Sequence, residues 1–361
     1  MVSNPRILVV GAGAGGLAFA LECATRGTKV RIIDKRSGRS VIEKATGVAA
    51  GVWEQLSKFD ISPKTVETAI PMRNFAFYDD GELVANVPVP LIEDNPPAYL
   101  YPQGELERHL EKALSIRGVD VEYGTEFHSY EESNSSICVK AQTKGGESFA
   151  LGAYDCVIGA DGAHSAVREA AEIPFVGRNY PGNWSVAEIT TTEWPENVQA
   201  QLFLQTNGEG LFLSQPAPGL VQGILNGENA AQQLTALFTD AELRYERHFN
   251  VALKRVRTPK KGRIWLIGDA AHVQSPVGGQ GLNLAIWDGV TLAEALLTGD
   301  SKVETILAKR ARRVLLFTDF DYRMLSTQSH VIRKARNKYW ECAAKHPSLA
   351  RWFFKIISGI W

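Results

Sequence analysis

The chain has 361 residues, enough for one large domain or two closely joined domains, which argues against a small binding module. Hydrophobic residues make up 45% of the chain and charged residues 22%, as in ordinary globular proteins. The net charge of −1 argues against nucleic-acid binding, because that function usually requires a basic excess.

The four cysteines indicate no metal site. Cys23, Cys138, Cys156 and Cys342 occur singly, without a C-x-x-C pair or a zinc-like spacing, so we interpret them as reduced, incidental thiols. The N-terminus lacks the layout of a signal peptide, and no apolar stretch approaches the roughly 18 residues of a membrane-spanning helix. We therefore expect a cytoplasmic protein.

The first elements along the chain form a βαβ unit. Residues 6–10, "RILVV", are typical of a buried parallel strand, and a glycine-rich turn and a helical pattern follow, which Gly27 ends. Residues 30–34, "VRIID", predict the second strand. Further on, residues 104–114 predict an amphipathic helix closed by Gly118, followed by the strand-like "VDVEYG".

Alternating patterns over about 171–258 predict an antiparallel sheet, and a similar pattern at about 73–89 could belong to the same sheet. After residue 290 the chain is again helical. We expect an α/β fold made of a Rossmann-like domain, an interleaved antiparallel-sheet domain and C-terminal helices. The predicted boundaries are 1–72, 96–170 and 259–300 for the first domain, 73–95 and 171–258 for the second, and 301–361 for the helices.

Gly11, Gly13 and Gly16 form a G-x-G-x-x-G pattern between the first strand and its helix. Gly11 permits the tight turn, Gly13 lets a pyrophosphate approach the backbone, and Gly16 lets helix and strand pack closely. The amides at the helix start favour phosphate charge. Asp34 ends the next strand and is expected to accept hydrogen bonds from a ribose, which favours FAD or NAD over a cofactor with a 2′-phosphate here.

Two later segments repeat the arrangement of a strand followed by an aspartate. "YDCVIGADGAHSAVRE" contains Asp161, Gly162, Ser165 and Arg168, and "GRIWLIGDAAH" is followed by the glycine-rich "VQSPVGGQGLN". An aspartate after a strand can simply cap a helix, so each motif alone could be structural. The three motifs in this order are difficult to explain in that way.

Together the motifs resemble the class A flavoprotein monooxygenases, FAD-dependent aromatic hydroxylases typified by para-hydroxybenzoate hydroxylase. That family combines the glycine fingerprint with a D-G-x-x-S-x-x-R motif and a G-D-A-A-H…P…G-x-G-x-N motif, which match residues 161–168 and 268–283 here. "YPQGELERHL" resembles the family segment that places Gln103 beside the flavin. Where the family often has arginine in an R-A-x-G-like context, this chain has Lys44, which lacks the arginine fork.

The resemblance implies one bound FAD, and NADPH or NADH as a transient electron donor without a domain of its own. It implies cofactor contacts from Gly11, Gly13, Ala14, Gly15, Gly16, Asp34, Lys35, Lys44, Gln103, Asp161, Gly162, Arg168, Asp269, Pro276, Gly279, Gly281, Leu282 and Asn283. The helix start near Gly281 would face the negative edge of the reduced ring.

The implied reaction is hydroxylation of a small aromatic or polycyclic substrate by O2 through a flavin C4a-hydroperoxide. In such enzymes the cofactor carries the difficult chemistry, while the protein excludes water and positions the substrate. Pro276 and His272 are the candidate catalytic residues, with a structural role as the alternative for His272. His164, Tyr180 and His248 are further titratable candidates.

Other functions remain open at this stage. An NAD-linked dehydrogenase would leave the second and third motifs unexplained, and a flavin-dependent halogenase would need a W-x-W-x-I-P segment that the chain lacks. The alternatives are an FAD-dependent reductase or oxidase and a flavin-binding protein without turnover. For the tail "SLARWFFKIISGIW" we favour a helix packed on the FAD domain over peripheral membrane contact. We expect a monomer or homodimer.

Overall fold

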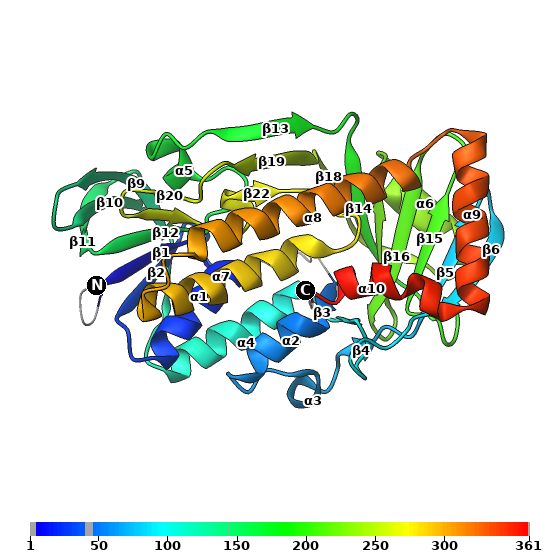
Figure 1. Ribbon diagram of the computed structural model, residues 1–361, viewed down its shortest axis with the longest axis horizontal. Coiled ribbons are helices and arrows are strands. Elements are labelled where there is room, and N and C mark those ends of the chain that lie inside the picture. The colour runs from blue at the N-terminus through cyan, green and yellow to red at the C-terminus, as the bar shows by residue number, and fades with distance from the viewer. Residues whose placement is uncertain (1–4, 40–45, 144, 360–361) are drawn as a thin grey trace.

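The computed structural model describes residues 5–39, 46–143 and 145–359 (Figure 1). Its first domain is built on a six-stranded sheet in the order β20-β21-β12-β1-β2-β8, parallel except at β20. These strands are β1 Ile7–Val10, β2 Val30–Asp34, β8 Val121–Tyr123, β12 Cys156–Gly159, β20 Lys260–Lys261 and β21 Ile264–Leu266. The predicted βαβ unit is confirmed, with helix α1 between β1 and β2.

Several helices belong to this domain. They are α1 Ala14–Thr25, α2 Ala50–Ser57, α3 Pro63–Val66, α4 Gln103–Ile116, α5 Ala166–Ala170 and α7 Gln280–Thr298, with a 3₁₀ turn at Gly268–Ala270. In Figure 1, α1, α4 and α7 lie on the viewer's side of the sheet. All four residues of β1 are buried, which explains its continuous apolar run. Gly27 and Gly118 have positive φ after α1 and α4 and end these helices as predicted.

Three small sheets complete the frame around the first domain. β9 Thr125–Glu132, β10 Ile137–Thr143 and β11 Ser148–Tyr154 form one antiparallel sheet, which the sequence patterns did not indicate. A second contains β13 Phe175–Asn179, β19 Ala252–Val256 and β22 His272–Val273, and a third β3 Gly47–Ala49, β4 Ile70–Pro71 and β7 Ala98–Leu100. The second sheet ties both ends of the 171–258 region to the third motif.

The second domain is a seven-stranded sheet in the order β18-β14-β17-β16-β15-β5-β6. Its strands are β5 Asn74–Asp79, β6 Glu82–Pro88, β14 Trp184–Thr190, β15 Ala200–Leu204, β16 Gly210–Ala217, β17 Leu220–Leu225 and β18 Glu242–Phe249, with α6 Ala230–Ala236 packed on it. The two distant segments therefore share one sheet, as expected. The sheet is mixed rather than wholly antiparallel, because β15 pairs with β5 in parallel.

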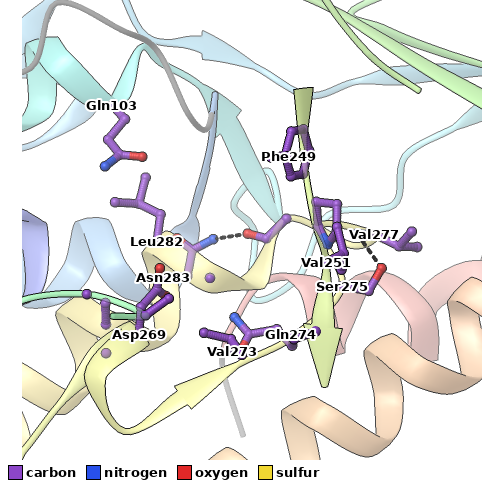
Figure 2. A pocket seen from close by; sticks show the side chains of 18 of the residues that line it. Gln103, Phe249, Val251, Asp269, Val273, Gln274, Ser275, Val277, Leu282 and Asn283 are labelled. Atoms are coloured by element: carbon purple, nitrogen blue, oxygen red, sulfur yellow. Dashed lines mark hydrogen bonds between the residues drawn. The ribbon is translucent and has the colours of Figure 1, made fainter. Parts of the chain in front are cut away.

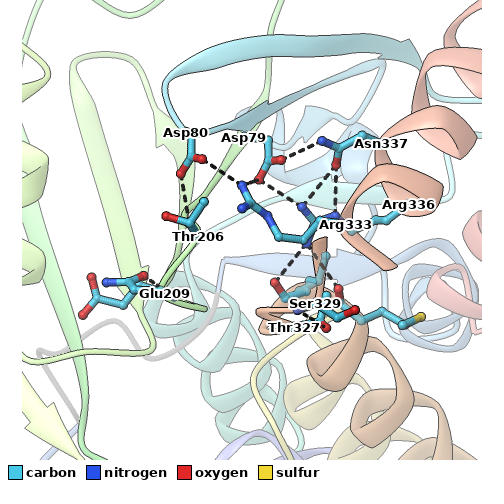
Figure 3. A network of polar contacts seen from close by, with 12 residues as sticks. Asp79, Asp80, Thr206, Glu209, Thr327, Ser329, Arg333, Arg336 and Asn337 are labelled. Carbon is cyan, nitrogen blue, oxygen red and sulfur yellow. Dashed lines mark hydrogen bonds and ion pairs between the residues drawn. The ribbon is translucent and has the colours of Figure 1, made fainter. Parts of the chain in front are cut away.

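Helix α8, Val303–Leu325, runs from the first domain toward the second, and α9, His330–Lys345, crosses the β5–β6 edge of the second (Figure 1). A polar network fixes α9 there (Figure 3). Arg333 donates to Asp79 at 2.9 Å and to Asp80 at 3.0 Å, and Arg336 donates to Asp79 at 3.0 Å. Both arginines are buried, so the network is part of the interface between α9 and the sheet and fixes the position of α9.

The C-terminal segment contains a 3₁₀ turn, Pro347–Ala350, and α10, Arg351–Ile357. The tail contacts the FAD domain, as expected, and it also packs against other parts of the chain. Phe354 packs in a cluster with Phe77 of the second domain and Trp340 of α9, while the carbonyl of Ser358 accepts a hydrogen bond from the amide of Gly51 in α2. The tail therefore bridges the two domains, because its aromatic side chains fill space beside the sheet. None of the described helices combines the length and apolarity needed to span a bilayer.

Helices α1 and α7 approach each other closely at glycine. A Cβ added to Gly289 would lie 2.3 Å from the carbonyl oxygen of Gly15 and 3.0 Å from the amide nitrogen of Phe19. A Cβ on Gly15 would lie 2.8 Å from the carbonyl oxygen of Ala285. These are backbone atoms, so no side-chain adjustment could relieve the overlap, and the two helix starts are thereby held together.

We predict that Gly289→Ala destabilises the protein by roughly 1–3 kcal/mol, although alanine has the better helix propensity. The added methyl group forces α1 and α7 apart. Gly38→Ala is the matched control, because a Cβ there meets no atom within 4 Å, and we expect a change within about 0.5 kcal/mol. Urea unfolding of both variants measures the effect, and equal stability of the two would contradict the packing argument.

Candidate cofactor and substrate site

A cavity of about 1470 Å³ begins at the first glycine loop, passes the third motif and ends against the second domain. In Figure 2, Gln103, Leu282 and Asp269 lie on one side of the view, and Phe249, Val251 and Val277 on the other. This volume exceeds the roughly 300–1,000 Å³ of common small-molecule pockets. It leaves room for an extended cofactor together with a second molecule.

The glycines of the first loop have different physical roles. Gly11 has φ of +107°, and a Cβ there would lie 2.3 Å from the carbonyl oxygen of Ala160. A Cβ on Gly16 would lie 2.0 Å from the carbonyl oxygen of Gly11. Gly13 lines the cavity, yet a Cβ there would meet no protein atom within 4 Å. Chain packing therefore explains Gly11 and Gly16, whereas the open space at Gly13 fits a ligand that approaches the backbone.

The start of α1 is in contact with a buried carboxylate that the sequence reasoning missed. Glu107 accepts a hydrogen bond from the amide of Ala14 at 3.2 Å and from Nε2 of Gln103 at 2.8 Å. Gln103, Ala14 and Glu107 all line the cavity. The signal was present in "QGELERHL", because positions four apart share one helix face, and Glu107 follows Gln103 by one turn.

Asp34 lies at the cavity wall with its carboxylate already oriented. Its Oδ2 accepts hydrogen bonds from the amide of Ala12 at 2.8 Å and from Nη2 of Arg36 at 2.9 Å. Burial opposes ionisation, but these hydrogen bonds outweigh it and hold the pKa of Asp34 below its usual value. The side chain is thus an ionised acceptor beside the loop, as a ribose hydroxyl requires. Lys35 lines the cavity next to it.

The second motif joins two segments of the cavity wall. Ser165 donates to Asp161 at 2.5 Å and caps α5 by accepting from the amide of Arg168 at 2.9 Å. The Arg168 guanidinium donates to the carbonyls of Ala270, at 3.1 Å, and Ala163, at 2.9 Å. Asp161, Gly162 and Arg168 all line the cavity, so the motif both fixes the wall and faces the space within it.

The third motif supplies a further part of the wall. Asp269, Pro276, Gly279, Gly281, Leu282 and Asn283 all line the cavity. Gly279 has φ of +62° and precedes the first residue of α7, whose start therefore opens on the cavity. A helix start carries partial positive charge, which favours a negative group at this position.

Asn283 uses its side chain to connect two loops. Its Oδ1 accepts from the amide of Ala49 at 2.8 Å, and its Nδ2 donates to the carbonyls of Gly279, at 2.7 Å, and Gly47, at 3.1 Å. The predicted cofactor contact would therefore involve the backbone or edge of Asn283 rather than a free amide group.

His272 is buried behind the motif and is not among the residues that line the cavity. Its Nε2 lies 2.6 Å from Oδ2 of Asp288, which also accepts from the amide of Gly268 at 3.3 Å. Burial disfavours the charged imidazole, but Asp288 outweighs it and raises the pKa of His272. This geometry favours the structural alternative for His272.

The remaining candidates fall in different places. His164 and Tyr180 line the cavity, whereas His248, on β18, does not. The Tyr180 hydroxyl donates to Asp319 at 2.8 Å. Lys44 lies outside the described residues. No group of His, Cys, Asp and Glu suited to a metal ion occurs within residues 5–39, 46–143 and 145–359.

We predict that Gly13→Val abolishes FAD binding without unfolding the apoprotein. Gly13 has φ of −82° and ψ of 176°, which valine adopts readily, and its Cβ position is open. Absorbance of the purified protein gives the FAD content, and thermal unfolding gives the stability. Gly11→Val is the control, since it should damage the fold as well. Full FAD occupancy in Gly13→Val would refute the assignment of this loop.

We predict that Asp288→Asn destabilises the protein by roughly 3–5 kcal/mol at pH values at which His272 is charged. The substitution leaves the buried imidazolium without its anionic partner. Since the folded pKa is raised, the charge-dependent stability is fully present below the ordinary imidazole value of 6.5 and is lost as pH rises through the folded value. Denaturant unfolding against pH should show the difference between the proteins shrinking with rising pH. A difference independent of pH would contradict the ion pair.

Comparison with known proteins shows which family the chain resembles. The family model described as "FAD binding domain" matches residues 5–233 and 226–316. The chain is 24% identical over 333 residues to 6-methylpretetramide 4-monooxygenase of Streptomyces rimosus, covering 86% of this chain and 59% of the relative. It is 26% identical over 311 residues to pentachlorophenol 4-monooxygenase of Sphingobium chlorophenolicum, covering 80% and 57%.

The chain thus spans less than two thirds of the length of these two curated relatives. Among solved structures, p-nitrophenol 4-monooxygenase from Pseudomonas putida DLL-E4 has the same fold, with a TM-score of 0.88, 20% identity and full coverage of both chains. The chain therefore belongs to the FAD-binding family of class A flavoprotein monooxygenases, the aromatic hydroxylases that its three motifs resemble.

Proposed function

We propose that this protein is an FAD-dependent monooxygenase that uses NADPH or NADH and O2 to hydroxylate an aromatic or polycyclic substrate through a flavin C4a-hydroperoxide. The observation that carries the proposal is the single cavity that extends from Gly13 and Asp34, past Asp269, to an apolar wall on the seven-stranded sheet. One end suits a dinucleotide, and the other suits a ring system.

The residues that line the cavity suit one FAD. Gly11, Gly13, Ala14, Gly15 and Gly16 would hold the pyrophosphate, Asp34 and Lys35 the adenosine half, and Gln103, Asp161, Gly162 and Arg168 the central part. Asp269, Pro276, Gly279, Gly281, Leu282 and Asn283 would hold the ribityl chain and the ring. The open space at Gly13 supports this assignment, because no protein atom fills it and a pyrophosphate could lie there.

When bound, FAD would supply the electron transfer and oxygen activation, and the protein would supply position and environment. The start of α7 would favour negative charge on the ring edge nearest Gly281. Phe75, Leu202 and Phe212 contribute apolar surface at the substrate end. Such a wall excludes water from the reacting centre and orients a flat ring by shape.

We predict that the purified protein is yellow and that aromatic compounds stimulate its oxidation of NADPH or NADH. Under labelled O2, one labelled oxygen atom should enter the product, as measured by mass spectrometry. The Gly13→Val protein is the control and should show no stimulation, because it retains the fold but should not hold FAD.

Two outcomes would favour the alternatives. Product formation that continues without O2 would indicate an FAD-dependent reductase. Bound FAD together with no substrate-stimulated nicotinamide oxidation across phenols, heteroaromatic rings and polycyclic compounds would indicate a flavin-binding protein without turnover.

A further inference from the structure

The substrate end of the cavity has an uneven polarity. Aromatic side chains from separate parts of the chain line it, including Tyr322 of α8, Trp340 of α9 and Phe353 of α10, and Phe317 of α8 packs against Phe353. Ring centroids are 5.8 Å apart for Phe317 and Phe353, and 5.5 Å for Phe353 and Trp340. This part of the wall therefore selects apolar rings.

One carboxylate interrupts that apolar surface. Asp321 lies one helical turn after Phe317 on α8 and lines the cavity. A Cβ added to Gly278 would lie 3.2 Å from Cε1 of Phe317 and 3.9 Å from Oδ2 of Asp321. The carboxylate thus sits against the loop of the third motif, on the side where the reactive ring is expected.

Asp321 forms no hydrogen bond or ion pair with any described residue. Asp319, two positions earlier on the same helix, differs: it accepts from the Tyr180 hydroxyl at 2.8 Å and pairs with Arg323 at 3.1 Å. Burial raises the pKa of Asp321 to about 7, and no neighbouring cation lowers it. Asp321 is half-buried and faces the cavity without a partner among the described residues, so its carboxylate is available to a ligand there.

The described cationic side chains of the cavity do not pair with Asp321. Among the described residues that line it, Lys35, Arg36, Arg168 and Lys254 belong to or border the cofactor-binding elements. None of these four cationic residues forms an ion pair with Asp321, and none lowers its pKa. This arrangement offers nothing to balance the carboxylate of an aromatic acid and places a like charge beside it.

We propose that Asp321 accepts a hydrogen bond from a hydroxyl group on the substrate, and that the site takes uncharged hydroxylated aromatic compounds rather than aromatic acids. The inference rests on the proposed function for the position of the flavin. If the proton transfers, the substrate O–H bond breaks, its electron pair stays on the oxygen and enriches the ring, and the new O–H bond forms on Asp321.

Titration of the FAD-bound protein with three matched probes tests the inference. The probes are 2-naphthol, 2-methoxynaphthalene and 2-naphthoate, and the flavin difference spectrum reports binding. At a pH above the pKa of Asp321, about pH 8.5, the wild type should bind 2-naphthol about tenfold more tightly than the methyl ether, as expected for a hydrogen bond to a charged acceptor, and should bind 2-naphthoate most weakly.

Asp321→Leu should lose the preference for 2-naphthol, and Asp321→Asn, which keeps the shape, should bind 2-naphthoate about tenfold better than the wild type. Glu304→Gln is the matched control, since Glu304 lies on the same helix but does not line the cavity. It should leave all three affinities unchanged.

A wild type without preference for 2-naphthol, including one that binds none of the probes, would overturn the inference, as would an Asp321→Leu protein that keeps the preference. The proposed function fails separately: naphthol selectivity dependent on Asp321, without O2-dependent turnover, would refute oxygenation while supporting the recognition role.

Discussion

The close packing of α1 against α7 determines where every other part of the site can lie. Gly15 and Gly289 remove the side chains between the two helices, so backbone meets backbone. The two helix starts, more than 250 residues apart in sequence, consequently open on the same cavity. A larger side chain at this crossing would separate the phosphate-facing loop from the loop beside the expected ring. The cofactor site is in this sense a product of helix packing.

Most motif side chains support the cavity rather than project into it. Asn283 connects two loops, Arg168 holds two backbone carbonyls, and His272 pairs with Asp288 behind the wall. What faces the cavity is largely backbone, glycine gaps and helix starts, which suit a long anionic ligand. These buried contacts explain why these residue types occur at these positions, because each side chain hydrogen-bonds with polar groups that would otherwise lack a partner.

The elements whose evidence is local could be predicted from the sequence. The βαβ unit and its glycine loop have short-range signals in periodicity and turn residues, and the pairing of 73–89 with 171–258 follows from their shared alternating pattern. The parallel pairing of β5 with β15 has no such signal, because strand direction depends on the path of the intervening chain. Asp321 could not be identified from the sequence either. In the pattern of α8 it resembles the other polar residues, and only the fold brings it close to Gly278.

The bridging position of α10 has a consequence for the order in which the protein is made. The ribosome releases the first glycine loop early, but α7 follows only after residue 279, and the aromatic wall of Phe353 and Phe354 later still. Until α7 and α10 have been synthesised, the nascent chain therefore lacks two parts of the cavity wall. Cofactor captured before α10 docks would meet a site that lacks the wall of Phe353 and Phe354, so complete loading should follow the docking of α10.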